Sequence, residues 1–136
     1  MKVKNNIKKY CCICLLICFL IVPAVACSLT KDEASEINIP YKMEKERELQ
    51  KSVDEGHQPW RLNPADVAYE SIVATIDKNI KYEKCSLITQ SDDEAIVQCA
   101  GIQNNYKVYL KRFFGKKSIW TAMKIQKSRT IKEHVK

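Results

Sequence analysis

Residues 85–99 read CSLITQSDDEAIVQC, and this stretch decides the fold. Apolar and polar residues alternate on both sides of Ser91-Asp92-Asp93, which is typical of two β-strands joined by a short turn. A three-residue loop there places Cys85 directly opposite Cys99. Cysteines so placed are close enough for a disulfide, which across this loop would add about 3 kcal/mol of stability in an oxidising compartment. The alternative is a pair of free, buried cysteines.

Two further turns are predicted after this hairpin. Asn104-Asn105 suits a tight turn, and Gly115-Lys116 suits a two-residue turn with glycine first. They pair Leu110 with Cys99 and Phe114 with Lys117. The following apolar or small side chains then share one sheet face, and this agreement supports the register: Leu87, Val97, Tyr106, Val108, Leu110, Thr121, Met123 and Ile125.

One amphipathic helix is predicted before the hairpin. Asn63 suits the cap position, Pro64 the first turn and Asp66 the positive end of the helix. Apolar residues then recur at helical spacing as far as Ile80, so we expect a helix over about residues 64–80. The expected fold class is α+β, with this helix packed on a four-stranded antiparallel β-meander.

The first 27 residues have the organisation of a secretory signal peptide. Four lysines precede an apolar stretch over residues 11–22, and the small-residue ending Ala24-Val25-Ala26 stands directly before Cys27. An uncleaved transmembrane anchor is the less favoured alternative, because a spanning helix needs about 20 apolar residues.

Ala24-Val25-Ala26-Cys27 resembles the lipobox of bacterial lipoproteins, whose final cysteine becomes the diacylated N-terminus. Ala24 departs from the pattern, which more often has a larger aliphatic residue there, so ordinary cleavage before Cys27 is the alternative. The resemblance implies an exported cell-membrane lipoprotein held by acyl chains such as palmitate on Cys27, and two chains suffice for stable anchoring. Ser28 is not the Asp that retains such proteins at the inner membrane, which favours the outer membrane where there are two. With Cys27 lipidated, Cys85 and Cys99 are left to pair.

Charge is distributed unevenly along the chain. Residues 105–136 carry +9, from ten Lys or Arg against one Glu, whereas residues 27–58 and 59–104 each carry −3. We therefore expect a signal peptide (1–26), a lipid-anchored polar tether (27–58), a small α+β domain (59–128) and a basic tail (129–136).

The sheet face opposite the helix is the predicted binding surface. Lys111 is expected opposite Trp120, within reach of a cation–π contact. Lysines interleaved with aromatic residues can bind anionic ligands, here an anionic envelope ligand or an acidic protein partner, whereas nucleic acid is not expected outside the cytoplasm. The alternatives are a solvated face or one covered by other residues. The candidate residues are Lys107, Tyr109, Lys111, Trp120 and Lys124.

No catalytic, cofactor or metal site is predicted. The sequence has no nucleophile elbow, zinc-protease motif or glycine-rich phosphate loop. Asp92-Asp93-Glu94 lacks the alternating spacing of a calcium loop, and His57 and His134 do not stand at zinc-ligand spacing from the cysteines.

These observations favour a membrane-tethered, non-enzymatic lipoprotein whose small domain binds another envelope component. An inhibitor, immunity or exclusion factor acting against a hydrolase or an incoming element is the alternative. A small hydrolase using Asp66, His57 or Glu70 in a pocket beside Trp60 is less favoured.

Overall fold

The computed structural model describes residues 34–130, so the signal segment, Cys27 and residues 131–136 of the basic tail lie outside the described residues. The fold is α+β, as expected, but with two α-helices and a five-stranded antiparallel sheet in place of one helix and four strands. In chain order the elements are β1 (Ser35–Asn38), α2 (Met43–Asp54), a 3₁₀ helix (Pro59–Leu62), α3 (Pro64–Thr75), a second 3₁₀ helix (Tyr82–Lys84), β2 (Cys85–Gln90), β3 (Glu94–Ala100), β4 (Asn104–Lys111) and β5 (Thr121–Arg129).

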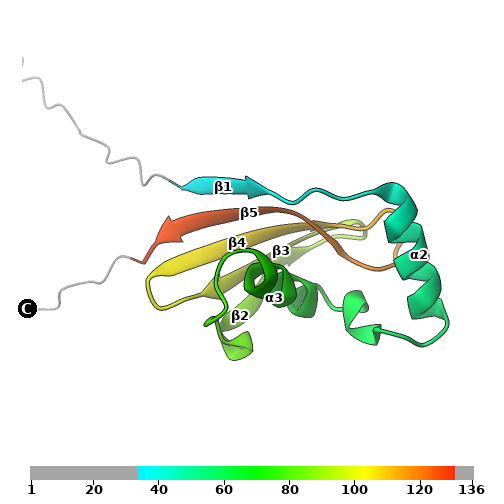
Figure 1. The fold of residues 1–136 in the computed structure, drawn as a ribbon, viewed down its shortest axis with the longest axis horizontal. Helices are drawn as coiled ribbons and strands as arrows, with labels where there is room; N and C mark the ends of the chain where they lie inside the picture. The colour runs from blue at the N-terminus through cyan, green and yellow to red at the C-terminus, as the bar shows by residue number, and fades with distance from the viewer. Residues whose placement is uncertain (1–33, 131–136) are drawn as a thin grey trace, which may run out of the picture. The chain divides into compact units, whose positions relative to one another are not determined.

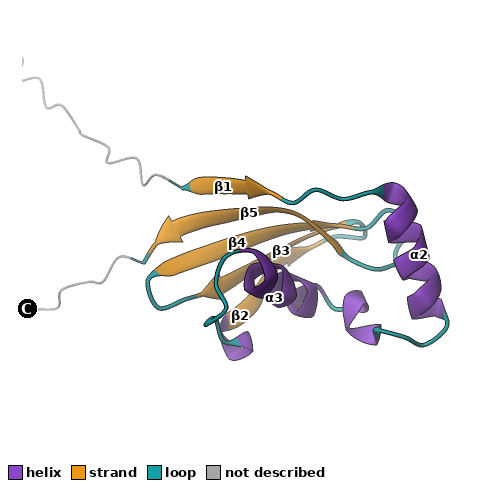
Figure 2. Cartoon of the chain, in the orientation of Figure 1, coloured by secondary structure: helices purple, strands orange, loops and turns teal. Residues whose placement is uncertain are grey.

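The sheet has the strand order β1-β5-β4-β3-β2 (Figure 1). α3 lies across one face, and α2 lies beyond one end of the strands (Figure 2). Among the described residues, no helix covers the opposite face of the sheet. Because residues alternate along β4, Lys107, Tyr109 and Lys111 lie on this open face.

The hairpin of residues 85–99 is confirmed. Cys85 pairs with Cys99 and Leu87 with Val97, and the two cysteines form a disulfide with their Cα atoms 4.0 Å apart. In the turn, the Ser91 amide donates to the Glu94 carbonyl at 2.7 Å. Leu87 is nevertheless 46% exposed, because β2 is the edge strand and its outer side has no neighbour among the described strands.

The other two turns were predicted wrongly. Cys99 pairs with Tyr106, not Leu110, because the turn uses residues 101–103 and leaves Asn104 in β4. The Gly101 amide closes this turn on the Asn104 carbonyl at 2.8 Å, and a Cβ on Gly101 would lie 2.7 Å from that oxygen. Only glycine fits this close approach.

The connection between β4 and β5 also differs from the prediction. Residues 112–120 form a nine-residue loop in place of a turn at Gly115-Lys116, and Phe114 and Lys117 are not a strand pair. Val108 therefore pairs with Ile125, and a register shift between Tyr109 and Leu110 places Leu110 opposite Ala122.

The core lies between α3 and the sheet. Asn63 caps α3 as predicted, since its side-chain oxygen accepts from the Ala65 amide at 3.0 Å. The helix ends at Thr75, earlier than predicted, although Ile80 beyond it is still buried. The core comprises Val67, Ala68, Ile72, Ile80, Ala95, Val97, Cys99, Tyr106, Val108, Leu110, Trp120, Ala122 and Ile125.

Part of the predicted polar tether is folded. β1 adds a strand to the edge of β5, and α2 contributes the buried residues Glu46 and Val53. The folded domain therefore begins near Ser35 and not at residue 59. Within residues 34–130, no helix has the length and apolar character needed to cross a membrane.

Candidate functional site

The open sheet face holds some of the predicted binding residues but not Trp120. Trp120 is fully buried in the core, and its amide donates to the Arg61 carbonyl at 2.9 Å. Lys111 lies opposite Thr121, so its predicted contact with Trp120 is wrong. The cation over the Trp120 ring is Arg112, whose guanidinium carbon lies 4.0 Å from the ring centroid.

The four other candidates lie on β4 and β5. Because residues alternate along a strand, Lys107, Tyr109 and Lys111 share one face of β4. Lys124 lies directly opposite Tyr109, with its ammonium 4.5 Å from the ring centroid and 3.0 Å from the carboxylate of Glu36 on β1. Lys124 is therefore already engaged, whereas the exposed Lys107 has no ion-pair partner among the described residues.

A shallow groove of about 220 Å³ runs beside Lys107. Three amide side chains contribute to its lining, which comprises Ala34, Gln98, Asn105, Tyr106, Lys107, Gln126 and Ser128. The Tyr109 hydroxyl donates to the Gln126 side-chain oxygen at 3.2 Å, so one wall of the groove is tied to the candidate aromatic residue. Amide groups, a hydroxyl and an ammonium together offer several donors to an anionic or polar ligand.

The groove residues Gln98, Asn105 and Gln126 were not predicted from the sequence as binding residues. They occupy alternate positions of their strands, on the same face as Lys107, so the period-two pattern was the available signal. Polar, uncharged side chains are common on the solvent-exposed face of a strand, so their type alone did not indicate a binding site. Only the pairing of Gln98 and Gln126 with Lys107 from either side brings the amides together.

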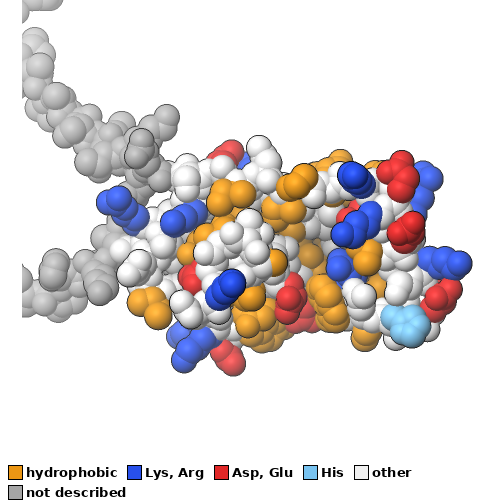
Figure 3. Space-filling view, in the orientation of Figure 1, with side chains coloured by type: hydrophobic (Ala, Val, Ile, Leu, Met, Phe, Trp, Pro, Cys, Tyr) orange, Lys and Arg blue, Asp and Glu red, His pale blue; other side chains and the backbone are white. Residues whose placement is uncertain are grey.

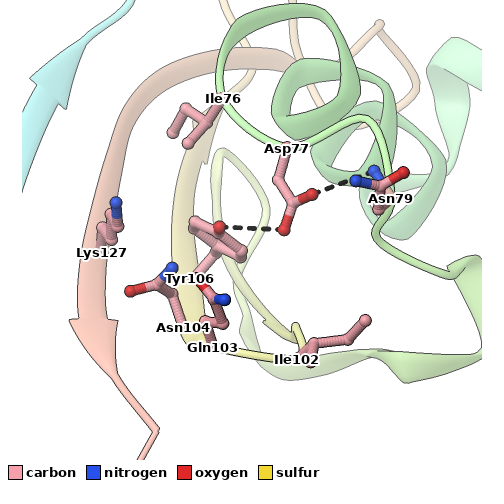
Figure 4. A pocket seen from close by; sticks show the side chains of 8 residues that line it. All are labelled: Ile76, Asp77, Asn79, Ile102, Gln103, Asn104, Tyr106 and Lys127. Carbon is pink, nitrogen blue, oxygen red and sulfur yellow. Dashed lines mark hydrogen bonds between the residues drawn. The ribbon is translucent and has the colours of Figure 1, made fainter.

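A second cavity, of about 320 Å³, lies at the end of α3 beside the turn of residues 101–103 (Figure 4). The Tyr106 hydroxyl donates to the Asp77 carboxylate at 3.0 Å, and the other Asp77 oxygen accepts from the Asn79 amide at 3.0 Å. Burial raises the pKa of Tyr106, and the hydrogen bond to Asp77 raises this pKa further. One carboxylate oxygen thus holds the chain after α3 against β4, and the other fixes the turn of residues 77–79.

A third cavity lies beside Trp60, where a hydrolytic pocket was the less favoured expectation. Asp66 and Glu70 line it together with Trp60. His57 is exposed and is not one of the lining residues. The cavity therefore unites two of the three expected polar residues but lacks the histidine.

The acidic hairpin tip is engaged in local contacts. The Asp92 carboxylate lies 2.6 Å from the ammonium of Lys116, and Asp93 accepts a hydrogen bond from the Ser91 hydroxyl at 3.2 Å. Within residues 34–130, no group of three or more His, Cys, Asp or Glu side chains is arranged to hold a metal ion.

Comparisons of the chain with known protein families, with characterised proteins and with solved structures found no match.

Proposed function

We propose that the chain is an exported lipoprotein, anchored through Cys27, whose small domain binds an anionic envelope component without catalysing a reaction. The groove beside Lys107 on the open sheet face is the observation that carries this proposal. An exposed ammonium next to amide N–H groups suits a carboxylate or phosphate, because charge-assisted hydrogen bonds are stronger than neutral ones.

The distribution of charge supports an anionic ligand. All of β4 except Asn104, the loop after it and β5 belong to the segment of residues 105–136 that carries +9. Lys107 and Lys111 lie on the same face of β4, four residues apart, at a separation of about 13 Å. Two cations at this spacing favour an extended ligand, such as a polyanionic glycan or an acidic protein patch, which can contact both.

Site-specific photo-crosslinking in intact membranes tests the proposal. A photoreactive residue in place of Gln98, in the groove, should capture one defined envelope component. The same residue in place of Glu48, on the exposed side of α2, should not capture it. Capture at both positions or at neither would contradict binding at this face.

Charge variants make the test specific. Lys107→Gln with Lys111→Gln should reduce capture and make it less sensitive to salt. Lys45→Gln with Lys51→Gln removes the same charge from exposed positions of α2 and serves as the matched control. Equal capture by the two double variants would show that this face is solvated surface and not a binding site.

A further inference from the structure

The cavity beside Trp60 lies among three segments of the chain: the 3₁₀ helix Pro59–Leu62, the middle of α3 and the 3₁₀ helix Tyr82–Lys84. Its volume is about 520 Å³, larger than that of the groove on the sheet. Three aromatic residues and two acids line it: Trp60, Tyr69, Tyr82, Asp66 and Glu70.

The two acids lie on one side of α3. Asp66 and Glu70 are four residues apart, which places them one above the other on the same helix face. No salt bridge within residues 34–130 involves either carboxylate, and no basic side chain lines the cavity. The lining residues themselves therefore carry two formal negative charges and no positive charge.

The aromatic residues form the other walls. The Tyr69 and Tyr82 rings meet edge to face, with centroids 5.6 Å apart and an interplanar angle of 89°. Tyr82 is 42% exposed, so its ring is open to a ligand. Figure 3 shows acidic side chains over α3 with hydrophobic surface on both sides of them.

One of the carboxylates lies next to one of the rings. The nearby Asp66 carboxylate raises the pKa of the Tyr82 phenol. Trp60 carries the guanidinium of Arg61 over its ring, 4.6 Å from the centroid, although Arg61 itself does not line the cavity. Trp60 thus already attracts one cation of the chain itself.

We propose that this cavity binds a small organic ammonium ion. Its alkyl groups would contact Tyr69, Tyr82 and Trp60, and its positive charge would face Asp66 and Glu70. Aromatic rings attract such cations through their quadrupoles, and uncompensated carboxylates add a direct charge interaction. This site is separate from the sheet face and has the opposite charge preference, so either proposal can fail without the other.

A chemical-shift titration of the full-length chain tests this inference. The protein would be studied in maltoside micelles, because a detergent with an ammonium headgroup would compete. Trp60 and Trp120 are the chain's two tryptophans, so their indole N–H signals report separately on the cavity and on the core. Choline should shift the Trp60 signal saturably and leave the Trp120 signal in place. Its uncharged isostere, 3,3-dimethylbutan-1-ol, should bind at least about tenfold more weakly.

The choice of cation distinguishes the sources of the ammonium group. Tighter binding of choline than of butylammonium would point to a quaternary solute or headgroup, and the reverse order to a primary amine. Either order supports the site. Equal binding of choline and its uncharged isostere, or no saturable shift with any ammonium probe, would overturn it.

Variants separate the site from the fold. Glu70→Gln, at an exposed position, should weaken choline binding about threefold to tenfold, and Tyr82→Ala should weaken it at least about threefold. Tyr82→Phe keeps the ring and should retain most of the binding. Glu83→Gln is the matched control, because Glu83 is exposed beside Tyr82 but does not line the cavity. Equal effects of Glu70→Gln and Glu83→Gln would show that general charge, not this cavity, attracts the cation.

Discussion

The Thr121 hydroxyl donates a 2.6 Å hydrogen bond to the carboxylate of Glu46, and both residues are buried although 75 positions separate them. On the next turn of the same helix, the Gln50 side-chain oxygen accepts from the Ile119 amide at 2.8 Å. These two hydrogen bonds attach α2 to Thr121, the first residue of β5, and to Ile119 in the loop before it. α2 also contributes Val53 to the buried apolar residues, so polar contacts and hydrophobic burial together hold it.

We expect Glu46→Ala to destabilise the fold by about 1–3 kcal/mol, because Thr121 would lose its buried acceptor. The partly buried Arg61, whose pKa is lowered by burial and raised by the charge of Glu46, would also lose its nearby anion. Urea unfolding at neutral pH measures the change. Glu48→Ala, at an exposed position of the same helix, should change stability by less than about 0.5 kcal/mol. Similar losses for both variants would show that helix formation, not the buried contact, sets the cost.

The disulfide gives a second prediction. Replacing Cys85 and Cys99 together by Ser should lower the free energy of unfolding by about 3 kcal/mol, because the unfolded chain gains the freedom of an open loop. Structure remaining in the unfolded state would reduce the loss. Intact mass after alkylation without reductant checks the bond itself: protein isolated from the envelope should have both thiols blocked, and labelling of both would refute the pairing in the cell.

Tyr106 should make stability depend on alkaline pH. Its side chain is buried, and its raised pKa means that the folded state resists losing the phenolic proton. This contribution is complete below about pH 10, the unfolded value, and is lost as the pH rises through the higher folded value. Unfolding free energies measured across this interval should therefore fall more steeply for the native chain than for Tyr106→Phe. The variant should also be less stable at neutral pH by about 0.5–1.5 kcal/mol, since it cannot donate to Asp77. Parallel pH curves would exclude Tyr106 as the titrating group.

The lipid anchor is tested at Cys27. Cys27→Ser should release the protein into the soluble fraction or stall its processing, because the acyl chains would have no attachment point. Cell fractionation and intact mass are the measurements. If the variant stays in the membrane and retains residues 1–26, an uncleaved anchor is the better explanation.

The sequence predicts best those features that depend on neighbouring residues. The Asn63 cap and the hairpin of residues 85–99 each need only a few consecutive side chains, and both are confirmed. Turn chemistry alone misplaced the next two turns. Asn104-Asn105 was assigned to a turn that instead uses Gly101, where the close approach of the Asn104 carbonyl excludes a side chain.

Despite those turns, the core face of β4 was predicted correctly. Cys99 pairs with Tyr106 where Leu110 was expected, an offset of four residues, and an even offset keeps every side chain on its own face. Tyr106, Val108 and Leu110 are accordingly all buried. The prediction failed for Trp120, because this residue lies in the loop before β5, where strand alternation does not apply. The Trp120 amide instead donates to the Arg61 carbonyl.

The candidate site was predictable only in part, because most of it depends on contacts between residues far apart in the sequence. Lys107 and Tyr109 follow from alternation along β4, whereas the groove beside Lys107 needs the correct partners on β3 and β5. The cavity beside Trp60 joins Asp66 to Tyr82 across 16 positions and a 3₁₀ helix that no local pattern indicates. In the sequence, Glu46 cannot be distinguished from the exposed charged residues around it. Its burial depends on the contact with Thr121, 75 positions away.

The pairing of β1 with β5 has a mechanical consequence. β1 is an edge strand with four residue pairs, and it runs antiparallel to β5, so the chain enters the sheet at Ser35 beside Lys127, close to where β5 ends. Tension applied between these two ends would load the strand pairs one after another, as in a zipper, and not all at once, as in shear. A pull from the amino-terminal side would therefore detach β1 at low force, while the disulfide-linked hairpin at the far edge of the sheet would remain unloaded.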